Sequence, residues 1–79
     1  MMYYTYVLKS KLDDKLYIGY TIDLKQRFKE HNDGNVEATK GRIPLTLVYY
    51  EACTDETKAI NREKYFKTGF GRKYLKSRI

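Results

Sequence analysis

The stretch Tyr17–His31, YIGYTIDLKQRFKEH, constrains the fold of this chain more than any other. Asp23 is a favourable N-cap residue, and it predicts a helix over residues 24–32. The i, i+3, i+4, i+7 spacing places four residues on one face of that helix: Leu24, Arg27, Phe28 and His31. Half of this inward stripe can ionise, which is costly on a buried face unless the groups are paired or carry out chemistry.

Three runs rich in aromatic and β-branched residues predict strands at residues 3–9, 15–20 and 45–51. A second helix is expected from a cap at Thr54 or Asp55 to about Lys67. Two glycines, Gly69 and Gly71, then predict an interruption before a short basic helix over residues 72–78. The expected order is β-β-α-β-α-α, in a single α+β domain over residues 1–79.

The charge of the chain favours a polyanionic partner. Sixteen Lys and Arg against ten Asp and Glu give a net charge of +6, which points to nucleic acid, with a basic surface that has no such partner as the alternative. Cys53 is the only cysteine, so neither a disulfide nor a thiolate metal site is expected. No apolar run approaches the roughly 20 residues of a membrane span, so we expect a cytoplasmic protein with no membrane partner.

A further charge falls on the inward face of the second expected helix. Glu63 lies in the middle of the apolar stripe formed by Ala59, Ile60 and Phe66. One interpretation is a buried Arg27–Glu63 ion pair with His31 as a satisfied neighbour. The other is an active site in which all three residues converge beside the tyrosine-rich strands.

These residue types suit phosphodiester hydrolysis with one metal ion. A lone carboxylate can hold a magnesium ion that keeps several waters and takes other ligands from a phosphate. An arginine can stabilise charge on the phosphodiester, and a tyrosine or histidine can move a proton to or from the attacking water. No Ser–His–Asp set and no Gly-rich phosphate loop of the P-loop kind is legible.

The spacing of these residues resembles the GIY-YIG nuclease domain. Tyr6 is followed eleven residues later by Tyr17-Ile18-Gly19, and Arg27 comes eight residues after that glycine. His31 and Glu63 stand where many members keep a histidine and a metal-binding glutamate. The resemblance covers essentially the whole chain and is closest to the small stand-alone bacterial members. The first motif reads Tyr4-Thr5-Tyr6, so it keeps only its tyrosine.

The resemblance implies a three-stranded antiparallel sheet flanked by helices, and a role for each site residue. Tyr6 and Tyr17 would line the site, one of them positioning or deprotonating water, and Arg27 would contact the scissile phosphate. His31 would assist proton transfer or hold Tyr6, and Glu63 would bind Mg²⁺ or Mn²⁺. The general base stays open, because tyrosine, histidine and metal-bound water are all chemically able.

The expected function is therefore a metal-dependent nuclease that hydrolyses DNA phosphodiester bonds. It would be structure-directed or weakly sequence-specific, and the family suggests DNA repair or recombination. Contacts to the nucleic acid are expected from Gly19, Lys40, Arg42, Arg72, Lys73 and Lys76. With no second domain to choose the target, a protein partner could supply targeting.

A departure from the family pattern supports an alternative function. Many family nucleases have a late asparagine near the site, and none follows Asn61 here. The alternative is a catalytically weak or inactive nucleic-acid-binding module that keeps the GIY-YIG fold. A third hypothesis is a structural or partner-binding domain that contains the Arg27–Glu63 ion pair.

Overall fold

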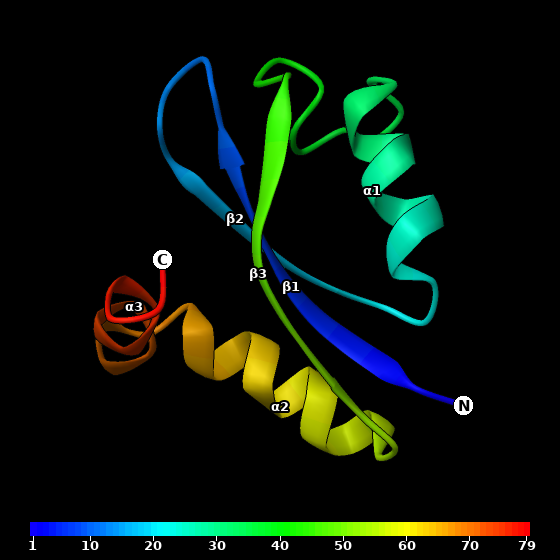
Figure 1. Cartoon of the computed structure of the whole chain (residues 1–79), viewed down its shortest axis with the longest axis vertical. Coiled ribbons are helices and arrows are strands. Elements are labelled where there is room, and N and C mark those ends of the chain that lie inside the picture. Colours follow the sequence, from blue (N-terminus) through cyan, green and yellow to red (C-terminus); the bar gives the residue numbers. More distant parts are fainter.

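The computed structural model describes all 79 residues and has the expected order of elements (Figure 1). These elements are β1 (Tyr3–Ser10), β2 (Leu16–Thr21), α1 (Leu24–Asn32), β3 (Leu45–Cys53), α2 (Glu56–Phe66) and α3 (Gly69–Lys76). The strands form one antiparallel sheet, so the predicted α+β fold is confirmed. None of the helices is long and apolar enough to cross a membrane.

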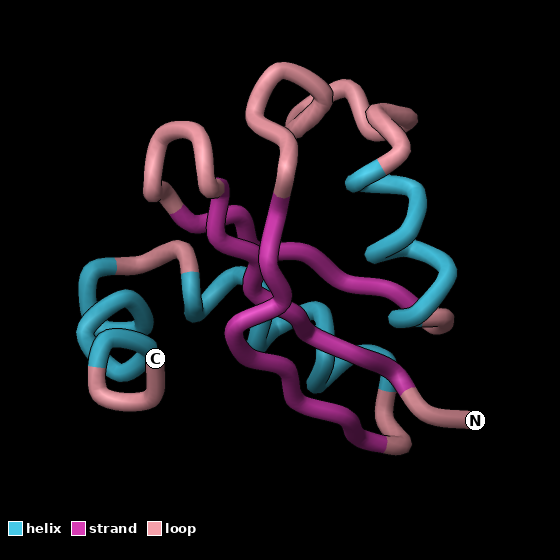
Figure 2. Tube along the Cα trace, turned by 45° about the horizontal axis from the view of Figure 1, so that its top comes forward, coloured by secondary structure: helices cyan, strands magenta, loops and turns pink.

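The strand β1 lies in the centre of the sheet, in the order β2-β1-β3. Helix α1 covers one face of the sheet, and α2 and α3 cover the other (Figure 2). Alternate residues of β1 therefore enter two separate apolar clusters. Val7 packs with Phe66 and Leu75 on the side of α2 and α3, whereas Tyr6 and Leu8 pack on the side of α1. A site built around Tyr6 thus lies between the sheet and α1.

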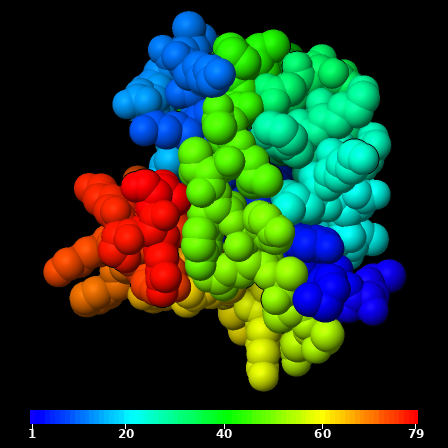
Figure 3. Space-filling view, viewed as in Figure 1, coloured from blue at the N-terminus to red at the C-terminus, as the bar shows by residue number.

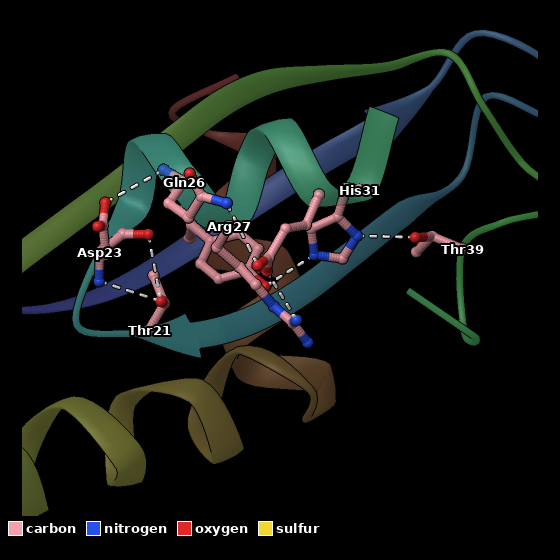
Figure 4. Close-up of polar contacts among 8 residues, drawn as sticks. Thr21, Asp23, Gln26, Arg27, His31 and Thr39 are labelled. Carbon is pink, nitrogen blue, oxygen red and sulfur yellow. Dashed lines mark hydrogen bonds and ion pairs between the residues drawn. The ribbon is translucent and has the colours of Figure 1, made fainter. Parts of the chain in front are cut away.

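The start of α1 is fixed directly after β2. The Asp23 side chain accepts a hydrogen bond from the Gln26 amide at 3.1 Å, and the Asp23 amide donates to Thr21 Oγ1 at 3.1 Å (Figure 4). The predicted cap and the predicted bounds of this helix are both confirmed. Because the cap residue Asp23 follows the last residue of β2 by two positions, the register of α1 against the sheet is fixed by the chain itself.

The start of α3 differs from the expectation. Gly69 and Gly71 do not interrupt the chain before a helix over residues 72–78; they form the first turn of α3, which Thr68 caps by accepting from the Gly71 amide. A Cβ on Gly71 would lie 1.9 Å from the carbonyl oxygen of Tyr65. The glycine therefore lets α3 cross closely over the end of α2, which brings Leu75 into the core.

An ion pair anchors α2 to β3. Arg62 Nε donates to Glu51 Oε1 at 2.9 Å, and Nη2 donates to Oε2 at 3.0 Å. The guanidinium of Arg62 also lies over the ring of Phe66, 4.6 Å from its centroid, and over Tyr74 at 4.9 Å. Arg62 thus packs α2 against β3. Its neighbour Glu63 lies on a different face of the helix.

Candidate active site

Tyr6 stands in the middle of β1 with only 1% of its surface exposed. Its hydroxyl shares a hydrogen bond with His31 Nε2 at 2.9 Å. His31 comes from the last turn of α1 and is fully buried, and its Nδ1 pairs with Thr39 Oγ1 at 2.7 Å. Figure 4 shows His31 and Arg27 projecting from α1 toward the strands, with His31 reaching Thr39. A continuous buried chain of hydrogen bonds therefore runs from Tyr6 to Thr39.

Gly19 lies opposite Tyr6 in the sheet and makes room for its ring. A Cβ on Gly19 would lie 2.4 Å from both Cζ and Oη of Tyr6. No side chain larger than hydrogen fits there while the tyrosine keeps its place. The structure thus gives this glycine a packing role, and its contact with nucleic acid stays a prediction.

Tyr17 lies two residues before that glycine, on the same face of the sheet. Its ring centroid is 5.1 Å from that of His31 and 6.4 Å from that of Tyr6. Tyr6 and His31 also meet edge to face, with centroids 5.7 Å apart. The three rings predicted to line one site are therefore packed together.

Arg27 sits one turn before His31 on α1, and its guanidinium faces the Tyr6 hydroxyl. Burial raises the pKa of Tyr6 to about 12, and Arg27 works against this rise. Arg27 Nη1 also pairs with Glu30 Oε1 at 3.2 Å, and about two fifths of each side chain is exposed (38% and 37%). Arg27 and Glu30 line an open hollow of about 470 Å³ beside the turn between β2 and α1. Arg27 therefore links the buried tyrosine to the surface.

His31 is held neutral by its surroundings. Burial lowers the pKa of its imidazole, and the positive charge of Arg27 lowers it further, while Glu30 opposes them. A neutral imidazole has one N–H donor and one acceptor nitrogen. The ring can thus relay a hydrogen bond between the Tyr6 and Thr39 hydroxyls without carrying a charge.

Glu63 is not paired with Arg27, so the ion pair of the structural hypothesis is not formed. Its carboxylate pairs instead with Lys67 Nζ at 3.1 Å, one turn along α2, and its side chain is 22% exposed. The negative charge of Glu63 nevertheless contributes to the raised pKa of Tyr6. The carboxylate and the tyrosine hydroxyl are therefore electrostatically coupled.

The donor set fits a single hard cation. No group of three or more His, Cys, Asp or Glu residues could enclose a metal ion. A magnesium or manganese ion held by Glu63 would therefore keep waters and take oxygen ligands from a bound phosphate, as Mg²⁺ commonly does. Glu63 already pairs with the ammonium of Lys67, so this carboxylate is placed to hold a positive charge.

The predicted nucleic-acid contacts fall in two places. Lys40 and Arg42 lie in the loop before β3, where Lys40 pairs with Glu37 at 2.9 Å and Arg42 with Asp13 at 2.9 Å. The guanidinium of Arg42 holds the pKa of Asp13 at about 2, so Arg42 is tied to the β1–β2 turn. The others lie on α3, on the other side of the sheet from α1 (Figure 1): Arg72, Lys73 and Lys76.

Sequence reasoning missed three partners of the site. Glu30 follows Arg27 at i+3, and Lys67 follows Glu63 at i+4, so both could have been found from helical spacing. Thr39 carries no such signal, because it stands in a loop and meets His31 only through the path of that loop.

The model of the GIY-YIG catalytic domain family matches residues 2–75. The chain belongs to the GIY-YIG family. It is 45% identical to the UPF0213 protein CPE1444 of Clostridium perfringens over 84% of this chain and 71% of that protein. It is 37% identical to the UPF0213 protein HQ_3675A of Haloquadratum walsbyi over 84% of this chain and 74% of that protein.

A solved GIY-YIG-type structure supports the fold. The solution NMR structure of the UPF0213 protein BH0048 from Bacillus halodurans matches with a TM-score of 0.61 and 34% identity, over 98% of this chain and 84% of that one. The predicted resemblance to small stand-alone members is thereby confirmed. A GIY-YIG domain implies an endonuclease with a nucleic acid substrate, and nucleases of this family generally use a divalent metal ion.

Proposed function

We propose that this protein is a metal-dependent nuclease that hydrolyses phosphodiester bonds in DNA. The observation that carries the proposal is the environment of one oxygen. Tyr6 Oη is hydrogen-bonded to His31 at 2.9 Å and faces Arg27, and the charge of Glu63 acts on it. This environment supports a site that combines a proton-transfer group, a cation for phosphate and a carboxylate for a metal.

Each residue then has a role set by its position. Glu63 would hold Mg²⁺ or Mn²⁺, which would supply Lewis-acid stabilisation of charge on the phosphate. Arg27, at the rim, contacts the scissile phosphate. Tyr6 and Tyr17 orient the attacking water, and Tyr6, whose pKa of about 12 keeps it protonated at neutral pH, gives or receives a proton only when substrate is bound. His31 holds Tyr6 in place.

Both charged residues are held by weak partners until substrate arrives. The Arg27–Glu30 and Glu63–Lys67 pairs are partly exposed, and pairs of that kind contribute about 0–1 kcal/mol. Arg27 could therefore leave Glu30 for a phosphate, and Glu63 could leave Lys67 for a divalent ion, at little cost. Such pairing favours a site that is formed in advance yet easily opened.

The choice of substrate rests on backbone contacts. The basic residues of α3 and of the loop before β3 meet phosphates, which position DNA without reading its sequence. We therefore propose a weak sequence preference and a dependence on DNA structure, of the kind met in repair or recombination, or targeting by a protein partner.

Cleavage by purified protein tests the proposal. Nicked, branched and single-stranded DNA are incubated with Mg²⁺ or Mn²⁺ and the wild type, Arg27→Ala or Glu63→Ala. Lys29→Ala is a matched control, because Lys29 lies on α1 and pairs with Asp33. We expect cutting by the wild type and the control only.

Two results would contradict the nuclease. One is an absence of cutting on every substrate, and the other is equal cutting by the wild type and Glu63→Ala. Salt-dependent DNA binding without metal-dependent cutting would instead support the binding module suggested by the missing late asparagine.

A further inference from the structure

The hydroxyl of Thr39 has a single side-chain partner. Thr39 is fully buried, and its Oγ1 meets only His31 Nδ1, at 2.7 Å. Its backbone is held by the loop itself, because its amide donates to the Val36 carbonyl at 3.0 Å and its carbonyl accepts from the Arg42 amide at 2.8 Å. The loop therefore presents one hydroxyl to the far side of the buried histidine.

The direction of the hydrogen bonds follows from counting protons. A neutral imidazole has one N–H, so two arrangements are open. In the first, the Tyr6 hydroxyl donates to Nε2 and Nδ1–H donates to Thr39. In the second, the Thr39 hydroxyl donates to Nδ1 and Nε2–H donates to Tyr6. The neutral ring required by both agrees with the lowered pKa of His31.

The first arrangement leaves the hydroxyl proton of Thr39 without an acceptor. The Thr39 hydroxyl would then have no acceptor in a place that water does not reach, and a buried donor without an acceptor is strongly disfavoured. The second arrangement frees the proton of Tyr6 instead. Tyr6 is also buried, but its hydroxyl faces Arg27, which is partly exposed and lines an open hollow together with Glu30, so this proton lies on the side from which water or substrate enters.

We propose that Thr39 is a positioning residue whose hydroxyl donates to His31 Nδ1, so that His31 donates through Nε2 to the oxygen of Tyr6. The tyrosine oxygen then accepts from a neutral imidazole and faces a guanidinium, two groups that favour negative charge on it. Its own O–H is left for the substrate side. His31 was predicted either to assist proton transfer or to hold Tyr6, and this arrangement favours the second role. The catalytic consequence of the arrangement rests on the proposed function.

The tautomer can be measured without any activity. His31 is the only histidine in the chain, so ¹⁵N-histidine labelling and long-range ¹H–¹⁵N NMR report this ring alone. At pH 7.5 we expect a protonated Nε2 and an unprotonated Nδ1 that accepts a hydrogen bond. A protonated Nδ1, whether in the other tautomer or in the imidazolium, would overturn the proposal. This readout decides it even if the protein cuts no DNA.

Two substitutions test the role of the hydroxyl. Thr39→Val keeps the shape and removes the hydroxyl, and Thr39→Ser keeps the hydroxyl. In Thr39→Val we expect the Nδ1 resonance to move to that of a nitrogen without a hydrogen bond. We expect kcat to fall on the order of tenfold with KM unchanged, because Thr39 touches no substrate. Thr39→Ser should restore both.

A Thr39→Val protein with an unchanged Nδ1 resonance and an unchanged kcat would also overturn the proposal. Should Thr39→Val fail to fold, the wild-type tautomer and Thr39→Ser still decide it, because a displaced Nδ1 resonance in Thr39→Ser would contradict the assigned bond. Cutting that fails in every variant, with the expected tautomer, would count against the nuclease and not against Thr39.

Discussion

The pKa of Tyr6 reflects a balance of opposing neighbours on one oxygen. Burial raises it, and the charges of Tyr17 and Glu63 add to the rise, whereas Arg27 lowers it. The net value of about 12 keeps the hydroxyl protonated in the free protein. If a bound cation neutralised the charge of Glu63, the pKa of Tyr6 would fall, so the arrangement favours proton transfer only in the complex.

The close contact between Gly19 and Tyr6 can be tested by adding one methyl group. In Gly19→Ala the new Cβ would meet Cζ and Oη of Tyr6 at 2.4 Å, so the ring must move. We expect a loss of about 1–3 kcal/mol in the free energy of unfolding, measured in urea, and a changed His31 NMR signal. Gly69→Ala is the control, since nothing lies within 4 Å of its Cβ. Equal stability of the two variants would contradict this packing.

The buried His31 makes a contribution to the free energy of unfolding that depends on pH. The pKa of His31 is lower in the folded protein than its ordinary 6.5, so below about pH 6.5 the unfolded chain binds more protons. The stabilising contribution of neutral His31 is fully present above pH 6.5. It is lost as the pH falls toward the pKa that His31 has in the folded protein. We therefore compare the unfolding free energies of the wild type and His31→Gln. Above pH 7 we expect their difference not to change with pH. Below pH 6.5 we expect the wild type to lose stability relative to the variant. Urea titrations from pH 5 to 8 measure it, and a difference that is flat over this range would contradict the pKa direction.

Two adjacent residues of helix α2, Arg62 and Glu63, have different roles. Arg62 turns toward β3 and is held by Glu51 and three aromatic rings. Glu63 has only Lys67 as a partner, and its negative charge acts on the Tyr6 hydroxyl. Arg62 therefore fixes the position of α2, which leaves Glu63 available to the candidate site.

Substitution of the two neighbours should separate these roles. We expect Arg62→Ala to cost about 2–4 kcal/mol in unfolding free energy, because it strands the part-buried Glu51 and removes the stacking. Glu63→Ala should cost less than about 1 kcal/mol, because its pair is partly exposed. Thermal and urea unfolding, with and without Mn²⁺, measure both. Mn²⁺ should stabilise the wild type but not Glu63→Ala; a costly Glu63→Ala would revive a structural role for that carboxylate.

Local signals in the sequence predicted most of the fold, and long-range contacts set what it missed. The caps at Asp23 and Asp55 fixed both helix starts, and the ionisable stripe on α1 marked Arg27 and His31 as site residues. Gly71 was misread because a close helix crossing and a break look the same in sequence. Thr39 was missed because the loop, whose path no local rule determines, brings it to His31.

The net charge of +6 is spread over separate surfaces of the protein. Helix α3 and helix α1 lie on opposite sides of β3, and each carries exposed basic residues (Figure 3). Only α3 continues from the helix that holds Glu63. DNA binding is therefore expected to depend more on α3 than on the outer surface of α1.

Neutralisation of equal charge on the two helices tests this asymmetry. We compare Arg72→Gln/Lys73→Gln on α3 with Lys25→Gln/Lys29→Gln on α1, so that the net charge matches. Loss of two phosphate contacts should reduce the slope of log K against log salt by about two for the α3 variant. The α1 variant should keep most of the wild-type slope in fluorescence anisotropy titrations. Equal slopes for both variants would show that only net charge matters.

The central place of β1 has a consequence for how such an activity is controlled. A strand that is hydrogen-bonded on both edges and covered on both faces exchanges its amide hydrogens only when the whole domain opens. Tyr6 is therefore carried by the segment least able to move on its own, and no loop rearrangement can withdraw it to give a resting form. Restraint has to act at the rim, through Glu30 on Arg27 and Lys67 on Glu63, or outside the protein, through whatever decides which DNA reaches it.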